Sequence, residues 1–347
     1  MLTIPVGIFN EGNTCFLNAL IQCISHSPSV ALESLQNSQD DLDVLVKSVL
    51  VAERAAPTVR GAVSLKTSLI HKVFGCPVGC QGQQDPCIFF TEICASDGVL
   101  ASKFRSSMTE ALMCVECNAI LGEPQILCEN YVHMLKYKAD TKAATICDLF
   151  VRNSTSDSIE GYKSPAHTKN KSSSKCEASM GVYQFRYFEG KLPELLCFSL
   201  SSRITNSRNF PRGSSTSSTL FKDCRYFEPG KSISLPETNM FNKKLLVKDK
   251  SVTNVLYTLY ATIVHEGQGP HNGHYSAYIR QEDQWFHVVY KMHIHEQICP
   301  PVLMSQHKMH CVWSFLLLIP DDSGRFPFYL LHHRTIVGFG RCQKKLH

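Results

Sequence analysis

The clearest pattern of apolar and polar positions lies near the start of the chain, between residues 15 and 25. Four apolar residues recur there at the spacing i, i+3, i+4, i+7: Leu17, Leu20, Ile21 and Ile24. This spacing places them on one face of an α-helix, so it predicts an amphipathic helix. The pair Ser27-Pro28 follows and predicts that the helix ends there.

The rest of the chain divides into a part with helical patterns and a part with strand patterns. Residues 29–113 mix helical periodicity with loops and predict a mostly helical half. The stretch 192–200 reads as a buried strand, and four later stretches are rich in β-branched and aromatic residues: 254–265, 274–280, 284–289 and 310–320. The turn-forming QED joins the second and third of these four, which predicts an antiparallel meander.

Two polar stretches, 156–175 and 201–219, are rich in serine and lysine or arginine, and they predict mobile loops inside the domain. No internal repeat is visible at a period of 20–50 residues. The last stretch, 321–347, has no pattern that assigns it to an element.

Composition and charge narrow the class of protein. With 347 residues, 44% hydrophobic and 19% charged, the chain is long and apolar enough for a sizeable core. A formal charge of +5 is too small a surplus to predict a nucleic-acid surface. No apolar run is long enough for a membrane span, and no secretory signal opens the chain, so we expect a cytoplasmic or nuclear protein. Most of the sixteen cysteines should then be reduced thiols.

Cys15 stands where the predicted helix begins, and three interpretations are open: a buried structural thiol, a metal ligand or a nucleophile. A helix N-terminus stabilises a thiolate, and a nucleophilic thiol also needs a base, usually histidine, brought close by the fold. His274 begins a predicted strand directly after Gly273 and could be that base. Periodicity alone favours structural roles for both residues.

Four motifs carry a resemblance to a known family. The stretch 7–24, GIFNEGNTCFLNALIQCI, resembles the cysteine box of the ubiquitin-specific proteases. The stretch 82–93 resembles their glutamine-aspartate box, GHYSAYIR followed by a Trp resembles their histidine box, and 192–203 is similar to the strand between them. The motifs occur in the family's order, and the resemblance spans residue 7 to about residue 320.

The resemblance implies an α+β fold of the papain-like cysteine protease type. It implies a helical thumb at about 1–110, antiparallel fingers and palm at about 111–320, and a substrate groove between them. The implied activity is hydrolysis of the bond after the C-terminal glycine of ubiquitin, and the implied partners are ubiquitin or ubiquitinated proteins. That reaction needs no cofactor.

The resemblance also implies roles for single residues. Cys15 would be the nucleophile, His274 the general base, and Asn10 a side-chain donor to the oxyanion. The substrate-binding residues would be Gln84, Asp85, Gly273 and Tyr275. Asp85 would hold the arginine-bearing tail of ubiquitin, and it could equally cap a helix whose first residue is Pro86.

Gly12 and Gly273 would serve backbone turns and leave space for the Gly-Gly end of the substrate.

The sequence departs from the family pattern after the histidine box. The acid that usually orients the histidine falls on Val289, and the next acid falls on Tyr290. Neither side chain can accept the imidazole Nδ1–H as a carboxylate does. Asp283 is a weak substitute. A rival interpretation is therefore a pseudoenzyme that binds ubiquitin, or another partner, without turnover.

Two further departures concern the glutamine-aspartate box and zinc. Where the family commonly has Ala-x-Glu after the aspartate, this chain has PCI at 86–88, so it lacks the glutamate that the family pattern provides for binding the ubiquitin tail. Cys114 and Cys117 match the first CxxC pair of a four-thiolate zinc site, but the second pair is absent. Cys176, together with His167, offers only a weak alternative, and we expect no bound metal.

Overall fold

The computed structural model describes the main helices and strands of the chain. The described residues are 5–55, 62–65, 84–95, 97–114, 120–127, 131–136, 150, 182–189, 192–201, 232–236, 254–269, 272–281, 284–288, 295–296 and 314–320. The polar stretches 156–175 and 202–219 and the tail 321–347 lie outside them.

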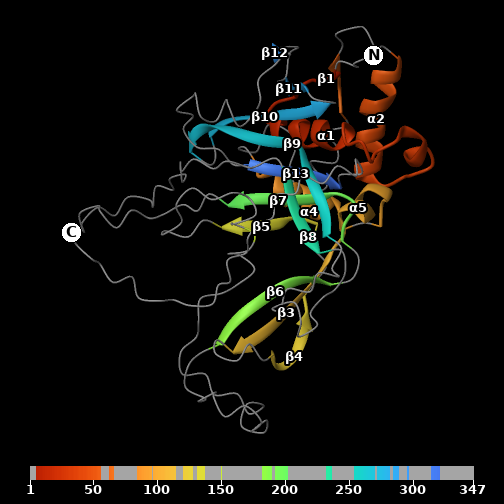
Figure 1. Cartoon of the computed structure of the whole chain (residues 1–347). Helices are drawn as coiled ribbons and strands as arrows, with labels where there is room; N and C mark the ends of the chain where they lie inside the picture. The colour runs from red at the N-terminus through yellow and green to blue at the C-terminus, as the bar shows by residue number, and fades with distance from the viewer. Residues whose placement is uncertain are drawn as a thin grey trace, which may run out of the picture.

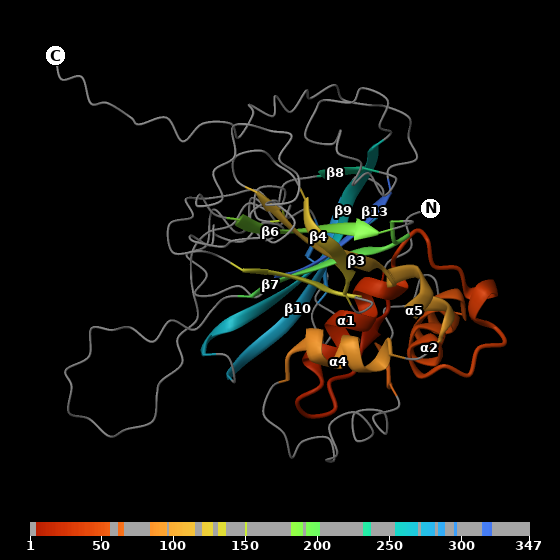
Figure 2. The ribbon, with the colours of Figure 1, turned by 90° about the horizontal axis from the view of Figure 1, so that it is seen from below.

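Among the described residues, the helices of more than one residue lie in the N-terminal third of the chain. They are α1 (Cys15–Ser25), η1 (Leu32–Leu35), α2 (Asp41–Ala55), α4 (Pro86–Ile93) and α5 (Val99–Phe104). Figure 2 shows α1, α2, α4 and α5 gathered on one side of the strands. The helix predicted at 15–25 is confirmed with these limits. An amphipathic helix would expose its polar face to solvent, but all residues of α1 are buried.

The largest sheet has eight strands in the described part of the chain. They are β5 (His133–Lys136), β7 (Leu196–Ser201), β8 (Ser232–Pro236), β9 (Asn254–Gly269), β10 (Asn272–Gln281), β11 (Gln284–Val288), β12 (His295–Glu296) and β13 (Ser314–Pro320). Their order is β12-β11-β10-β9-β13-β7-β5, and β8 also pairs with β9. The predicted meander is confirmed for β9, β10 and β11, which pair antiparallel in sequence order.

The last strand of the predicted meander lies elsewhere than expected. β13 returns to the other side of β9 and also pairs with β7, so it sits in the middle of the sheet (Figure 1). The described side chain of this strand, Leu317, is fully buried in the core. Within the described part of the large sheet, one pairing is parallel, between β5 and β7. A small sheet of two strands, β1 (Gly7–Ile8) and β2 (Ala62–Val63), is also parallel.

A separate sheet of three strands, β4-β3-β6, extends away from the large sheet (Figure 1). It consists of β3 (Ser107–Cys114), β4 (Ile120–Ile126) and β6 (Val182–Glu189). β3 corrects the prediction of a mostly helical half, which included residues 107–113. Its residues MTEALM favour a helix by intrinsic propensity, but pairing with β4 and β6 overrides that preference.

The core joins the helices to the large sheet. Phe16 of α1 meets Phe89 of α4 edge to face, with ring centroids 5.8 Å apart. Side chains of β9 and β10 complete the same cluster, which includes Ile263, Ala277 and Ile279. α1 is therefore held between α4 and the sheet, and its first residue has a defined place relative to β10.

A buried carboxylate fixes the position of α5 relative to α2. Asp43 of α2 accepts hydrogen bonds from the backbone N–H groups of Val99 and Leu100, at 2.8 and 2.9 Å. The hydroxyl of Ser38 donates to the same carboxylate at 2.6 Å. In the part of the chain that the structure describes, no helix is both long and apolar enough to cross a membrane.

Candidate active site

The loop before α1 is tied to the start of the helix by its own side chains. The Asn10 Oδ1 accepts from the Thr14 backbone N–H at 3.1 Å and from its hydroxyl at 2.9 Å. The Thr14 hydroxyl oxygen also accepts from the Glu11 N–H at 3.0 Å. Gly12 has a φ of 88°, a conformation that favours glycine. The helix then begins at Cys15, whose side chain is 5% exposed and lies at the positive end of the helix.

His274 reaches the same region from the opposite end of the chain. It lies on β10, which packs against α1, and its register partner on β9 is Glu266. The strand bulges at Gly273, where a side-chain Cβ would overlap the carbonyl oxygen of Glu266. Glycine is thus required for the close approach of two strands, and the substrate contact expected from the sequence stays a prediction.

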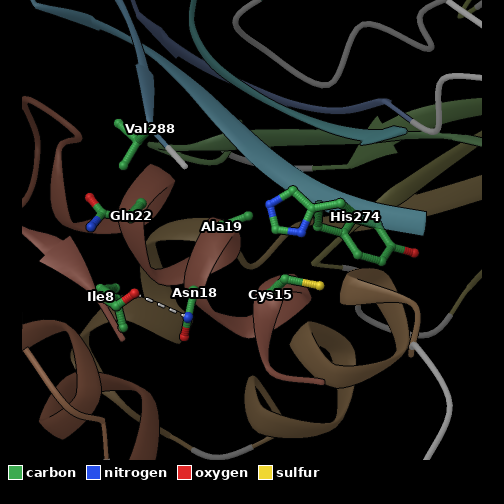
Figure 3. A pocket seen from close by; sticks show the side chains of 8 residues that line it. Ile8, Cys15, Asn18, Ala19, Gln22, His274 and Val288 are labelled. Carbon is green, nitrogen blue, oxygen red and sulfur yellow. Dashed lines mark hydrogen bonds between the residues drawn. The ribbon is translucent and has the colours of Figure 1, made fainter. Parts of the chain in front are cut away.

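A small pocket brings the two residues together. It has room for about one water molecule, with a volume of about 10 Å³. Its lining comprises Ile8, Cys15, Asn18, Ala19, Gln22, His274, Tyr275 and Val288 (Figure 3). Figure 3 shows the His274 ring above the first turns of α1, next to Ala19 and Cys15. Of the predicted site residues, Cys15, His274 and Tyr275 line this pocket, and Asn10, Gln84, Asp85 and Gly273 do not.

The carboxamide of Asn10 has only one possible orientation. The Thr14 backbone N–H is a donor and cannot accept, so the Asn10 atom that faces it must be the oxygen. The amide nitrogen therefore points away from Thr14. The carboxamide atom that does not face Thr14 is thus a donor, and its contact with an oxyanion stays a prediction from the sequence.

Asp85 has the capping role that the sequence allowed. Its side chain accepts from the Cys87 N–H at 2.8 Å, at the start of α4, and Pro86 is the first helical residue. Burial raises the pKa of Asp85, and the hydrogen bond from Cys87 opposes that shift. Gln84, directly before it, is half-buried.

Tyr275 connects the Asp85 region to the pocket. Burial raises the pKa of its phenol, and the neighbouring groups Asp85, Cys87 and Cys15 raise it further. The phenol thus lies within electrostatic reach of both the capping carboxylate and the thiol.

The pocket is apolar where a catalytic acid would be expected. Among the described residues that line it, β11 contributes Val288, and none is an acid. Val289, Tyr290 and Asp283 lie outside the described residues. Burial lowers the pKa of His274, which favours a neutral imidazole. A neutral imidazole beside a thiol can accept the proton as the sulfur attacks a carbonyl carbon.

The zinc candidates fall mostly outside the described residues. Cys114 is a buried, reduced cysteine at the end of β3, whereas Cys117, Cys176 and His167 are not described. Among the residues that the structure describes, no group of three histidine, cysteine or acidic side chains is arranged to hold a metal ion.

Sequence reasoning missed the polar residues of α1 that line the pocket. Asn18 and Gln22 follow Cys15 by three and seven positions, on one helix face, and both are buried. Counting only the apolar positions of this helix overlooked them. Two polar side chains at this spacing on an otherwise apolar helix indicate that their face of the helix is also buried against the protein.

The fold is that of the ubiquitin-specific proteases. The chain is similar to the SAGA Ubp8/Sgf11/Sus1/Sgf73 DUB module bound to ubiquitin aldehyde, with a TM-score of 0.62, 18% identity, and coverage of 91% of this chain and 70% of that one. A related DUB module bound to monoubiquitin matches with a TM-score of 0.60. The predicted papain-like α+β class is therefore confirmed.

The family model for ubiquitin carboxyl-terminal hydrolase matches residues 92–292, more than half of the chain. The chain belongs to this family, as its motifs predicted. The matched stretch includes His274 and ends before β12, and it begins after Cys15 and Asp85.

Curated relatives agree with this assignment at low identity. Human ubiquitin carboxyl-terminal hydrolase 17-like protein 10 is 24% identical over 294 residues, which are 82% of this chain and 51% of that protein. Ubiquitin carboxyl-terminal hydrolase 23 of Arabidopsis thaliana is also 24% identical, over 305 residues, with 82% and 32% covered. The chain thus spans about half the length of the first relative and a third of the second.

Proposed function

We propose that the chain is a cysteine-dependent deubiquitinase that hydrolyses the peptide or isopeptide bond after the C-terminal glycine of ubiquitin. The observation that carries the proposal is the pocket in which Cys15, at the start of α1, meets His274, on β10. These residues come from opposite ends of the chain, and both belong to motifs that resemble the family's catalytic boxes. The ubiquitin bound in the related DUB modules supports the same substrate.

The reaction begins when the His274 imidazole takes the proton of the Cys15 thiol. The sulfur bonds to the carbonyl carbon of the terminal glycine, and the electron pair of the C=O bond moves to the oxygen. The Asn10 amide donates a hydrogen bond to that oxygen, a contribution typically worth about 3–4 kcal/mol of barrier. The C–N bond then breaks, and the imidazolium gives its proton to the leaving lysine amine. A water molecule, deprotonated by His274, hydrolyses the thioester and regenerates the thiol.

The residues around Tyr275 would bind the tail of ubiquitin. Burial raises the pKa of Asp85, so a guanidinium placed beside it would stabilise the ionised carboxylate. Gln84 precedes this carboxylate, and Tyr275 contributes an apolar wall to the pocket. Gly273, at the bulge of β10, keeps the strand edge beside His274 free of a side chain.

A second candidate function is binding of ubiquitin without turnover. The specific observation that favours it is the replacement of the orienting acid by Val289, with Tyr290 next and with Val288 in the pocket. In serine proteases, loss of the orienting acid lowers turnover by about four orders of magnitude. A thiol is more acidic than a serine hydroxyl, so the loss should be smaller for Cys15.

Hydrolysis of a ubiquitin C-terminal amide reporter tests the proposal. The wild-type protein should release the reporter, and Cys15→Ala should not. Val289→Asp should raise kcat, because a carboxylate there would orient His274 and stabilise the imidazolium. Ubiquitin binding without release by either the wild type or Val289→Asp would favour the second candidate. A cytoplasmic or nuclear location, and the absence of a bound metal, stay predictions from the sequence.

A further inference from the structure

The backbone of residues 6–9 is held by side chains of two helices. The Gln22 Nε2 donates to the Val6 carbonyl oxygen at 2.5 Å, and the Glu53 carboxylate accepts from the Val6 N–H at 3.2 Å. The Asn18 Nδ2 donates to the Phe9 carbonyl oxygen at 3.0 Å and lies 3.4 Å from that of Ile8. Side-chain amides from α1 thus satisfy carbonyl groups along this segment.

Asn18 holds the peptide group that leads directly into Asn10. The Phe9 carbonyl belongs to the same planar peptide unit as the Asn10 nitrogen, so the hydrogen bond from Asn18 fixes where Asn10 begins. Asn18 is 7% exposed, and its orientation is defined because both neighbouring carbonyl oxygens can only accept. Figure 3 shows its amide directed toward Ile8.

Asn18 also lies one helical turn after Cys15 and lines the same pocket. A rigid helix turn therefore connects the nucleophile to the residue that holds the Phe9–Asn10 peptide. Thr14, the residue before Cys15, holds the side chain of Asn10, because its backbone N–H and its hydroxyl both donate to the Asn10 carboxamide oxygen. Two hydrogen-bonded connections therefore fix the position of Asn10 relative to the helix that carries the thiol.

We propose that Asn18 is a positioning residue for hydrolysis, acting through Asn10. The inference rests on the proposed function and deepens it, because it names what sets the distance between the oxyanion donor and the sulfur. A donor contributes to catalysis only when it meets the developing oxyanion, and a misplacement of about 1 Å can cost on the order of 100-fold in rate. Gln22 and Glu53 act farther from Asn10, at Val6.

The test compares steady-state hydrolysis of a ubiquitin C-terminal amide reporter by four proteins. Asn18→Ala should lower kcat by about 10-fold or more and change KM by less than about 2-fold, since its loss affects the transition state. Asn18→Leu, which fills the space but lacks donors, should give the same result. Tyr257→Phe is the control: its hydroxyl donates to the Pro193 carbonyl at 2.5 Å in a different core cluster. It removes a comparable buried hydrogen bond and should leave kcat unchanged.

A double-mutant cycle shows whether Asn18 acts through Asn10. The kcat of the double variant Asn10→Ala, Asn18→Ala should equal that of Asn10→Ala within about 3-fold. Asn18 cannot position the Asn10 amide once that amide is gone, so its loss then has no further effect. Multiplied effects, or a kcat for Asn18→Ala equal to that of the wild type, would overturn the inference and leave the proposed function intact. A wild-type protein without turnover would contradict the proposed function itself, and with it the catalytic role of Asn18.

Discussion

His133 should make the stability of the protein depend on pH. It lies on β5 of the large sheet and is 7% exposed, and its Nε2 lies 3.0 Å from the hydroxyl of Ser106, directly before β3. Its ring also meets Phe188 of β6 and Phe198 of β7. The imidazole therefore occupies the junction between the two larger sheets, where a positive charge would have little access to water.

The magnitude follows from the pKa of this imidazole. Burial lowers the pKa of His133 from 6.5 to about 4. The folded state then binds fewer protons than the unfolded state between these values, so the free energy of unfolding falls as the pH decreases below 6.5. From pH 7.5 to pH 5 the loss amounts to about 2 kcal/mol, and it reaches about 3 kcal/mol at pH 4.

Urea unfolding at pH 7.5, 6.5, 5.5 and 5.0 measures this effect. His133→Phe, which keeps an aromatic ring at the junction but cannot titrate, serves as the matched variant. From pH 7.5 to pH 5, the unfolding free energy of the wild type should fall by about 2 kcal/mol relative to that of the variant. Parallel pH profiles for the two proteins would refute the reasoning, because the buried imidazole would then titrate equally in both states.

Substitutions at two further positions, Asp43 and Asp85, test contacts of the helices. Asp43→Ala removes the acceptor of the Val99 and Leu100 N–H groups and should lower the unfolding free energy by about 2–4 kcal/mol, measured in urea; a loss below about 1 kcal/mol would show that α5 is held by other contacts. Asp85→Ala removes the α4 cap seen at Cys87 and should cost about 1 kcal/mol, whereas Asp85→Asn keeps an acceptor and most of that stability. Both Asp85 variants should raise KM for a ubiquitin reporter. An unchanged KM for Asp85→Asn would show that this carboxylate only caps the helix.

Local patterns predicted the elements that position the candidate site. The apolar spacing after Cys15 predicted α1 with the correct limits, although the helix is buried on every face and not only on the apolar one. The QED turn predicted the β10–β11 hairpin, and the register pairs Gln281 with Gln284 around it. Asp85 before Pro86 predicted a helix start, because these residues satisfy the first N–H groups of a helix.

Features set by distant partners could not be read from local patterns. The pattern of β13 predicted a strand, but the residues SFLLLIP do not indicate that its neighbours are β7 and β9. The helix-favouring residues of β3 became a strand through pairing with β6, which follows about seventy residues later. Asn18 is polar within an apolar helix, and its role emerges only once the Phe9 carbonyl is placed beside it.

The central claim is that the Cys15 sulfur is a nucleophile in a site that recognises the tail of ubiquitin. Its most direct test is incubation of the protein with ubiquitin that carries a thiol-reactive group at its C-terminus, followed by mass mapping of the labelled peptide. We expect one adduct on Cys15, which should be absent from Cys15→Ala and should form more slowly in His274→Ala. Ubiquitin bound without an adduct, or an adduct on a different cysteine, would contradict it.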